Sequence, residues 1–269
     1  MKSLSIEDAF QWSQRFAVRE WRLLLPVAFA FLALPALALA LLMPPRIAAV
    51  PITPQTIMPI VQSVPWLVPA SIVVELLALV GGLAIVALAL VPRISVREAL
   101  SLAFQRLLVF VAALVLILLG ELFAATLLAL LFTLARLSVM IQQSLLVGVL
   151  LGISLFLSVR LVVLGPVVIA SRAGPIAVLR LAWELTAGAF WRLLGVLVIY
   201  ALGGMIVVLA SAFAFGAILV LGGRAIGAPD LGAVLSTVYL RVALAIFWMG
   251  FHVLGVSLYR QLGGTIRGA

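Results

Sequence analysis

The sequence predicts an all-α integral membrane protein, a polytopic bundle of six transmembrane helices with three amphipathic interfacial helices on its cytoplasmic face. Of the 269 residues, 67% are hydrophobic and 9% are charged, whereas soluble domains are about half apolar and about a quarter charged. Six apolar runs reach the roughly 20 residues that a helix needs to cross the hydrocarbon core. Residues 1–269 are expected to form a single membrane domain.

The apolar runs are predicted to be helices rather than barrel strands, because they do not alternate apolar and polar residues with a period of two. More than twenty residues precede the first run, including Glu7, Asp8 and Glu20. The first run is therefore expected to be a span and not a cleavable signal, although its end, ALALALLMPP, is similar to a cleavage site. In chain order the runs are Leu23–Met43, Leu67–Leu90, Leu107–Leu134, Leu145–Leu164, Leu193–Leu221 and Leu235–Leu258.

The distribution of Lys and Arg predicts the orientation of the spans. Of the 17 basic residues, 13 fall on one side of the runs, and Arg46, Arg136, Arg224 and Arg241 fall on the other. Both termini are therefore expected in the cytoplasm. The net charge of +9 indicates contact with anionic lipid headgroups rather than with nucleic acid.

An amphipathic helix is expected before the first, third and fifth runs. Ser5 with Asp8, and Ser95 with Glu98, fit the capping box that starts a helix, and Gly174-Pro175 fits a third helix start. Basic and indole side chains near these starts suit the headgroup layer, where they would meet anionic phospholipids. The headgroup candidates are Arg15, Arg19, Arg22, Arg106, Arg180, Arg192, Trp12, Trp21, Trp183 and Trp191.

The three helix starts indicate an internal repeat. They fall at residues 5, 95 and 174, a period of roughly 80–90 residues, and each candidate unit holds one amphipathic helix and two spans. The candidate units are residues 1–91, 92–170 and 171–269, related by an axis along the membrane normal. Alternatively, any apolar helix that follows a basic amphipathic helix produces the same pattern without a repeat.

The connection between the first two spans is rich in proline, which disfavours a regular helix. We expect an irregular external cap there. The prolines are Pro44, Pro45, Pro51, Pro54, Pro59 and Pro65.

The C-terminal third carries a recognisable pattern. It combines the Gly174-Pro175 start, a Trp/Leu-Thr-x-Gly-x-Phe-Trp run and a terminal Tyr-Arg-Gln-Leu. This pattern resembles the membrane domain attached to some bacterial glycerophosphoryl diester phosphodiesterases and to related uncharacterised inner-membrane proteins. The resemblance covers residues 165–265 and implies a six-helix bundle in a bacterial inner membrane. It implies no phosphodiesterase activity, because the catalytic module of that family is a separate soluble barrel.

The sequence offers little for enzyme chemistry. It has no Cys, one His and eight acidic residues, and it contains no HExxH, GxSxG or Walker-type motif. We therefore expect no enzyme, catalytic residues, metal site or cofactor. Ionisable residues within spans are costly in hydrocarbon and often functional; here they are Glu75, Glu121, Arg160 and His252.

Each of these four residues also has a purely structural interpretation. Arg160 could extend to the interface, Glu75 could pair with Arg241, and His252 could donate one hydrogen bond to a neighbouring helix. Glu121 lies deepest in its span and is the strongest candidate for handling an ion, a proton or a ligand.

Two functions are compatible with the sequence. The preferred one is a non-enzymatic membrane protein that interacts with lipids or serves as an accessory or scaffold subunit, with a membrane protein or a second copy as a candidate partner. The alternative is a small transporter or channel subunit with Glu121 in a polar pathway.

Overall fold

The computed structural model describes residues 5–43, 54–136 and 138–263, which form helices and no strand. Six helical stretches are long and apolar enough to cross a membrane, so the predicted fold class is confirmed. They are α2–η1–α3 (Trp21–Ala28, Phe29–Ala33, Leu34–Leu42), α6 (Leu67–Leu90), α7 (Val96–Leu134), α8–α9 (Val139–Arg160, Leu164–Ala170), α11 (Phe190–Ala225) and α12 (Pro229–Gln261). The shorter helices are α1 (Ile6–Arg19), α5 (Pro54–Ser63) and α10 (Pro175–Thr186).

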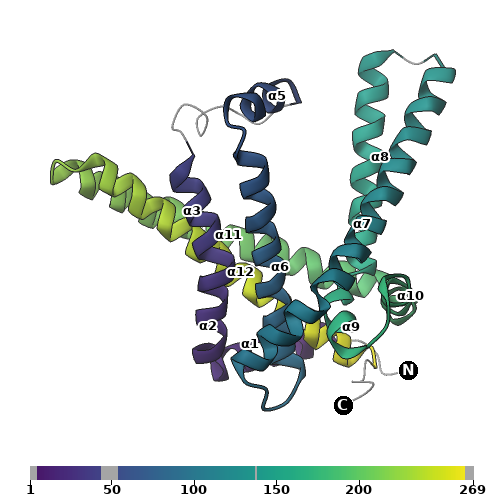
Figure 1. The fold of residues 1–269 in the computed structure, drawn as a ribbon, viewed down its shortest axis with the longest axis horizontal. Coiled ribbons are helices and arrows are strands. Elements are labelled where there is room, and N and C mark those ends of the chain that lie inside the picture. The colour runs from purple at the N-terminus through teal and green to yellow at the C-terminus, as the bar shows by residue number, and fades with distance from the viewer. Residues whose placement is uncertain (1–4, 44–53, 137, 264–269) are drawn as a thin grey trace.

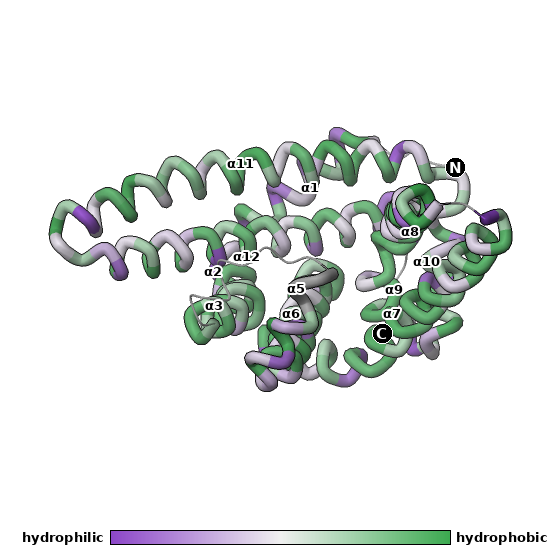
Figure 2. Tube along the Cα trace, turned by 90° about the horizontal axis from the view of Figure 1, so that it is seen from above, coloured by the Kyte–Doolittle hydropathy of each residue, from purple (hydrophilic) through white to green (hydrophobic). Residues whose placement is uncertain are grey.

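The long helices pair into three hairpins, formed by α2–η1–α3 with α6, by α7 with α8, and by α11 with α12 (Figure 1). The hairpins diverge from a common base, which consists of α1, α9, α10 and the adjoining ends of α6, α7 and α12. The α11–α12 hairpin runs across the other two, since Figure 2 views α3, α6 and α8 nearly end on while α11 and α12 extend along the picture.

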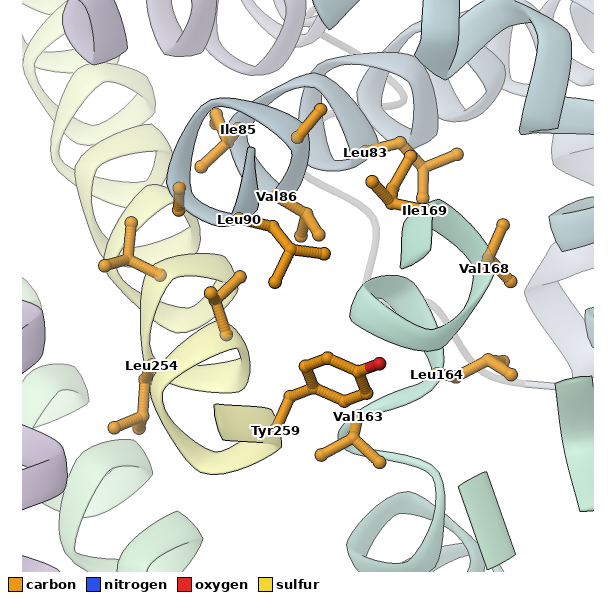
Figure 3. Packing of buried hydrophobic residues seen from close by; sticks show 14 of the residues in the cluster. Leu83, Ile85, Val86, Leu90, Val163, Leu164, Val168, Ile169, Leu254 and Tyr259 are labelled. Carbon is orange, nitrogen blue, oxygen red and sulfur yellow. The ribbon is translucent and has the colours of Figure 1, made fainter. Parts of the chain in front are cut away.

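The hydrophobic core lies in the base. Every residue of α6 from Val80 to Leu90 is buried, whereas none from Leu67 to Leu79 is. The buried half of α6 packs against α9 and against the C-terminal end of α12 (Figure 3). The free ends of the hairpins hold few buried side chains, so the base is the part of the molecule that fixes the hairpins relative to one another.

Side chains from distant parts of the chain cap helix ends at the base. The Arg260 guanidinium donates to the main-chain oxygens of Ala89 at 2.8 Å and Leu90 at 3.3 Å, at the C-terminal end of α6. Arg106 of α7 donates to the main-chain oxygen of Ser171, which follows α9. The last carbonyls of a helix have no partner within it and carry partial negative charge. The two arginines therefore satisfy groups that would otherwise be unpaired.

The predicted helix starts are present, with one difference. Ser95 and Glu98 form the complete capping box, and Pro175 is the first residue of α10. The Ser5 hydroxyl accepts from the Asp8 N–H, but the Ser5 N–H donates to Gln261 Oε1 at 3.1 Å instead of to Asp8. The first start is therefore joined to the C-terminal end of α12.

The expectation for the proline-rich connection is wrong in most of the part that the structure describes. Residues 54–63 form α5 with Pro59 inside it, so the prediction that this part of the connection is irregular was wrong; Pro54 occupies the first position, where no N–H is needed. Residues 44–53 lie outside the described residues. In the first span, Pro35 follows the π-helical turn η1, which accommodates the clash of the proline ring with the preceding turn.

The expected amphipathic helices differ among the three units. α1 and α10 are separate helices, and α1 buries Ala9 and Phe16 while exposing Arg15 and Arg19. The middle one is not separate, because α7 runs without a break from Val96 to Leu134. Their location at a membrane surface and the threefold repeat stay predictions.

The contacts of Arg260 lead to a prediction about stability. We expect Arg260→Met to lower the free energy of unfolding by about 1.5–3 kcal/mol, the usual contribution of hydrogen bonds from a charged donor. Thermal unfolding in detergent micelles, followed by circular dichroism, would measure this. Arg97→Met is the matched control, because Arg97 is exposed in the first turn of α7. Equal unfolding temperatures for the two variants would contradict the role of Arg260.

Candidate functional site

Three of the four ionisable residues predicted within spans line two cavities that meet at His252. The Glu75 cavity, of about 380 Å³, lies between α6 and α12. The Glu121 cavity, of about 340 Å³, lies between α7, α8 and α12. Both are lined by Val86, Phe110, Gly165 and His252. The fourth residue, Arg160, lines neither of them.

The Glu75 cavity is apolar apart from its charged residues. On α12, Arg241, Trp248 and His252 are spaced by seven and four residues and so share one helix face. Arg241 and His252 are eleven residues apart, which is ~16 Å along a helix. Opposite them, α6 contributes Glu75 near its first third and Gly82 farther along. Arg241 and His252 thus lie at the two ends of the α12 wall, and the other lining residues are mostly hydrocarbon.

Glu75 and Arg241 do not form the ion pair that the sequence suggested. The described part of the chain has one ion pair within 4.0 Å, between Arg19 and Glu20. The Arg241 Nε is buried and has no hydrogen-bond partner there, while the Glu75 side chain is exposed. A buried N–H without an acceptor is costly, so the cavity offers a ligand both this donor and the exposed Glu75 side chain.

The Glu121 cavity has a different polar character. The Ser154 hydroxyl of α8 donates to Glu121 Oε1 at 3.0 Å. This bond joins the two helices of one hairpin midway along their length. Ser158 and His252 also line this cavity, so it offers hydroxyl, carboxyl and imidazole groups but no arginine or lysine.

Gly82 allows His252 to occupy the junction of the cavities. A Cβ added at Gly82 would lie 2.5 Å from His252 Nε2 and 2.7 Å from its Cε1. Such distances are well inside van der Waals contact, so any larger residue would displace the imidazole. Gly203, by comparison, has nothing within 4 Å of an added Cβ.

Arg160 has a structural environment of its own. Its guanidinium lies 4.8 Å from the Trp183 ring centroid and 5.5 Å from that of Phe156. Its Nε and Nη1 atoms are buried and have no hydrogen-bond partner among the described residues. Cation–π contacts with two rings stabilise a desolvated guanidinium, and they fix α8 against α10 at the base.

The headgroup candidates fall into two groups. Most are exposed near the base: Arg15, Arg19, Arg22, Arg180, Arg192, Trp21, Trp183 and Trp191. Arg106 and Trp12 are partly buried and serve packing. Arg106 caps α9, and Trp12 lies under the Arg260 guanidinium, 4.6 Å from its ring centroid. A role of the ten candidates in headgroup binding stays a prediction.

Sequence reasoning counted Arg241 among the basic residues outside the cytoplasm and as a possible partner of Glu75, and it overlooked Ser154 and Trp248. Arg241 interrupts the run Leu235–Leu258, and this position inside a span was the signal that could have placed it with the site. Ser154 gave no signal, because its role depends on the facing helix.

The two cavities offer charged, hydroxyl and imidazole groups to a ligand. Within the described residues, no group of three or more His, Asp or Glu side chains is close enough to hold a metal ion. The chain matches no family model, no curated protein and no solved structure. The resemblance of residues 165–265 therefore stays a prediction, and the function must be argued from the two cavities.

The contact of Gly82 with His252 can be tested with a single signal, because His252 is the only histidine. We expect Gly82→Ala to displace the imidazole and to shift its Cε1–H NMR resonance. The measurement needs protein in micelles without a histidine tag. Gly203→Ala is the control and should leave the resonance in place. An unchanged resonance in Gly82→Ala would show that the two helices are not in contact at this point.

Proposed function

We propose that this protein is a non-enzymatic membrane protein that binds an amphiphile with a zwitterionic headgroup in the Glu75 cavity. The observation that carries the proposal is the pair of unpaired opposite charges, Glu75 and Arg241, in one cavity with apolar walls. The buried Arg241 Nε needs an acceptor, which a phosphate or carboxylate of the ligand would supply.

The Glu75 carboxylate determines which anion-bearing headgroups would bind beside Arg241. A carboxylate at Glu75 repels a purely anionic ligand and attracts an ammonium group. The Trp248 ring lines the same cavity and favours a cation at its face. A ligand with both an anionic and an ammonium group therefore satisfies both charges, as phosphatidylethanolamine would.

The size and walls of the cavity suit part of a lipid. Ligand sites are typically about 300–1,000 Å³ and mostly apolar, and the Glu75 cavity measures about 380 Å³. Leu32 and Ala36 from the first span, together with Leu79 and Leu244, supply hydrocarbon surface for the start of an acyl chain. The side of the cavity at Glu75 is exposed, which gives lipid a lateral entry.

The proposal includes an orientation. The exposed arginines and tryptophans of α1, α10 and the start of α11 would face the cytoplasmic leaflet of a bacterial inner membrane, with both termini in the cytoplasm. Arg136 and Arg224 lie near the opposite ends of two hairpins, which supports this assignment by the distribution of basic residues. An accessory or scaffold role beside another membrane protein is compatible with ligand binding.

Lipid titration followed by native mass spectrometry tests the proposed site. We expect the protein to bind phosphatidylethanolamine more tightly than phosphatidylglycerol. Arg241→Gln should weaken phosphatidylethanolamine binding by about tenfold, the effect of losing one charge-assisted hydrogen bond. Glu75→Gln should remove the preference between the two lipids, because it removes the group that distinguishes them.

Arg224→Gln provides the matched control, since Arg224 is exposed on α11 and lies outside the cavity. It should bind both lipids as the unmodified protein does. An equal effect of Arg224→Gln and Arg241→Gln, or a protein without preference between the lipids, would refute the proposed site.

A second candidate function is proton-linked transport through the Glu121 cavity. It is favoured by the position of Glu121 and His252 on one cavity, with the Ser154 hydroxyl bonded to the carboxylate. Carboxyl and imidazole groups within a membrane often relay protons.

Transport can be tested separately from lipid binding. In proteoliposomes that contain a pH-sensitive dye, Glu121→Gln should abolish a pH-dependent flux, because an amide cannot release a proton. Glu184→Gln, at an exposed position on α10, should leave the flux unchanged. Absence of flux with the unmodified protein would eliminate the transport function and leave the lipid-binding proposal intact.

A further inference from the structure

A third cavity lies in the base and shares no lining residue with the Glu121 cavity. It measures about 580 Å³ and is formed where the junction of α1 and α2 faces the loop that follows α6. Three arginines from widely separated parts of the sequence line it: Arg19, Arg93 and Arg260. Glu20 is the acidic residue in its wall. We call it the Arg93 cavity.

Two of the three arginines have partners within the fold, and those of Arg260 fix it in place. Arg260 donates to the carbonyls that end α6 and lies over the Trp12 ring. Arg19 Nε lies 2.9 Å from Glu20 Oε1. The Glu20 carboxylate thus offsets one guanidinium, and the remaining two give the cavity a net positive charge. Fixed arginines of this kind favour anions with several acceptor oxygens.

Arg93 is an exposed arginine of this cavity and has no partner in the described part of the fold. Its guanidinium has no hydrogen bond or ion pair within the described ranges, and its φ is +58°. A residue with a Cβ adopts this left-handed conformation unfavourably, and glycine would adopt it freely. Such strain is typical of functional positions. The sequence thus has an arginine where glycine would fit the backbone better, as it also does at Arg136, which lies outside the cavity.

We infer that the Arg93 cavity binds a phosphate group, with Arg93 as the main ligand-binding residue and Arg260 as its fixed neighbour. Bidentate contact between guanidinium and phosphate oxygens supplies the recognition. The phosphate could belong to a lipid headgroup or to a soluble phosphate, since both present the same oxygens. Apolar and aromatic walls, including Phe16, Leu23 and Leu88, would contact the group to which the phosphate is attached.

This inference is independent of the proposed amphiphile site. Leu88 and Ala89 of α6 line the Arg93 cavity, whereas Val74 to Val86 of that helix line the Glu75 cavity. The test can therefore use a full-length Arg241→Gln protein, in which the amphiphile site is disabled. Failure of one site then leaves the other measurable.

The experiment compares two sources of phosphate. Inorganic phosphate is titrated by calorimetry, and phosphatidic acid is titrated against phosphatidylcholine by native mass spectrometry. We expect binding in at least one arm and a loss of about tenfold or more in Arg93→Gln, as for one charge-assisted contact. Binding of inorganic phosphate would identify a soluble ligand, and binding of phosphatidic acid alone would identify a headgroup.

Two further variants separate ligand binding from folding. Arg93→Gly relieves the backbone strain, so its unfolding temperature should equal or exceed that of the parent while phosphate binding is lost. Arg97→Gln changes an exposed arginine four residues away, outside the cavity, and should bind as the parent does. Equal losses in Arg93→Gln and Arg97→Gln would reveal a diffuse basic surface and overturn the inference. So would the absence of binding in both arms.

Discussion

The structure depends on how helix ends are satisfied at the base. Arg260 of the last span caps α6 of the first hairpin, and Arg106 of the second hairpin caps α9. In a bilayer, lipid tails are as apolar as the helix side chains, so burial of apolar surface does not drive helices to associate. Side-chain packing and interhelical hydrogen bonds drive their association instead. Unpaired carbonyls in an apolar environment cost several kcal/mol. Each arginine therefore joins segments that the sequence places far apart.

The restriction of these contacts to one end explains the shape of the molecule. The buried halves of α6 and α12 meet in the base, whereas the far parts of the three hairpins diverge (Figure 1). Small residues permit close approach at particular points, as Gly81 does against Phe31 and Gly82 against His252. Where the hairpins separate, cavities open beside the remaining polar side chains. The same geometry that concentrates stability at the base thus creates the candidate ligand sites farther along the helices.

Charge follows a consistent pattern in these sites. Arginines that stabilise the fold have carbonyl or aromatic partners, as Arg260 and Arg160 do. Arg241 and Arg93 line cavities without an ion pair or hydrogen bond within the described residues. The buried Arg241 Nε lacks the acceptor that a ligand would supply, and the exposed Arg93 side chain is free to contact one. The two cavities would then recognise different chemistry, a zwitterionic headgroup between spans and a phosphate at the base.

The sequence by itself determined the six spans and the capped start at Ser95, and it singled out Glu75, Glu121 and His252 as candidates. These follow from local properties, namely hydropathy over a window, cap chemistry and the cost of a charge in hydrocarbon. Tertiary structure alone decided that His252 lines two cavities, one together with Glu121 and the other together with Glu75. It also decided that Glu75 and Arg241 line the same cavity without forming an ion pair. Such relations depend on which faces of distant helices come together. Hydropathy cannot encode them, because nearly every face of these helices is apolar.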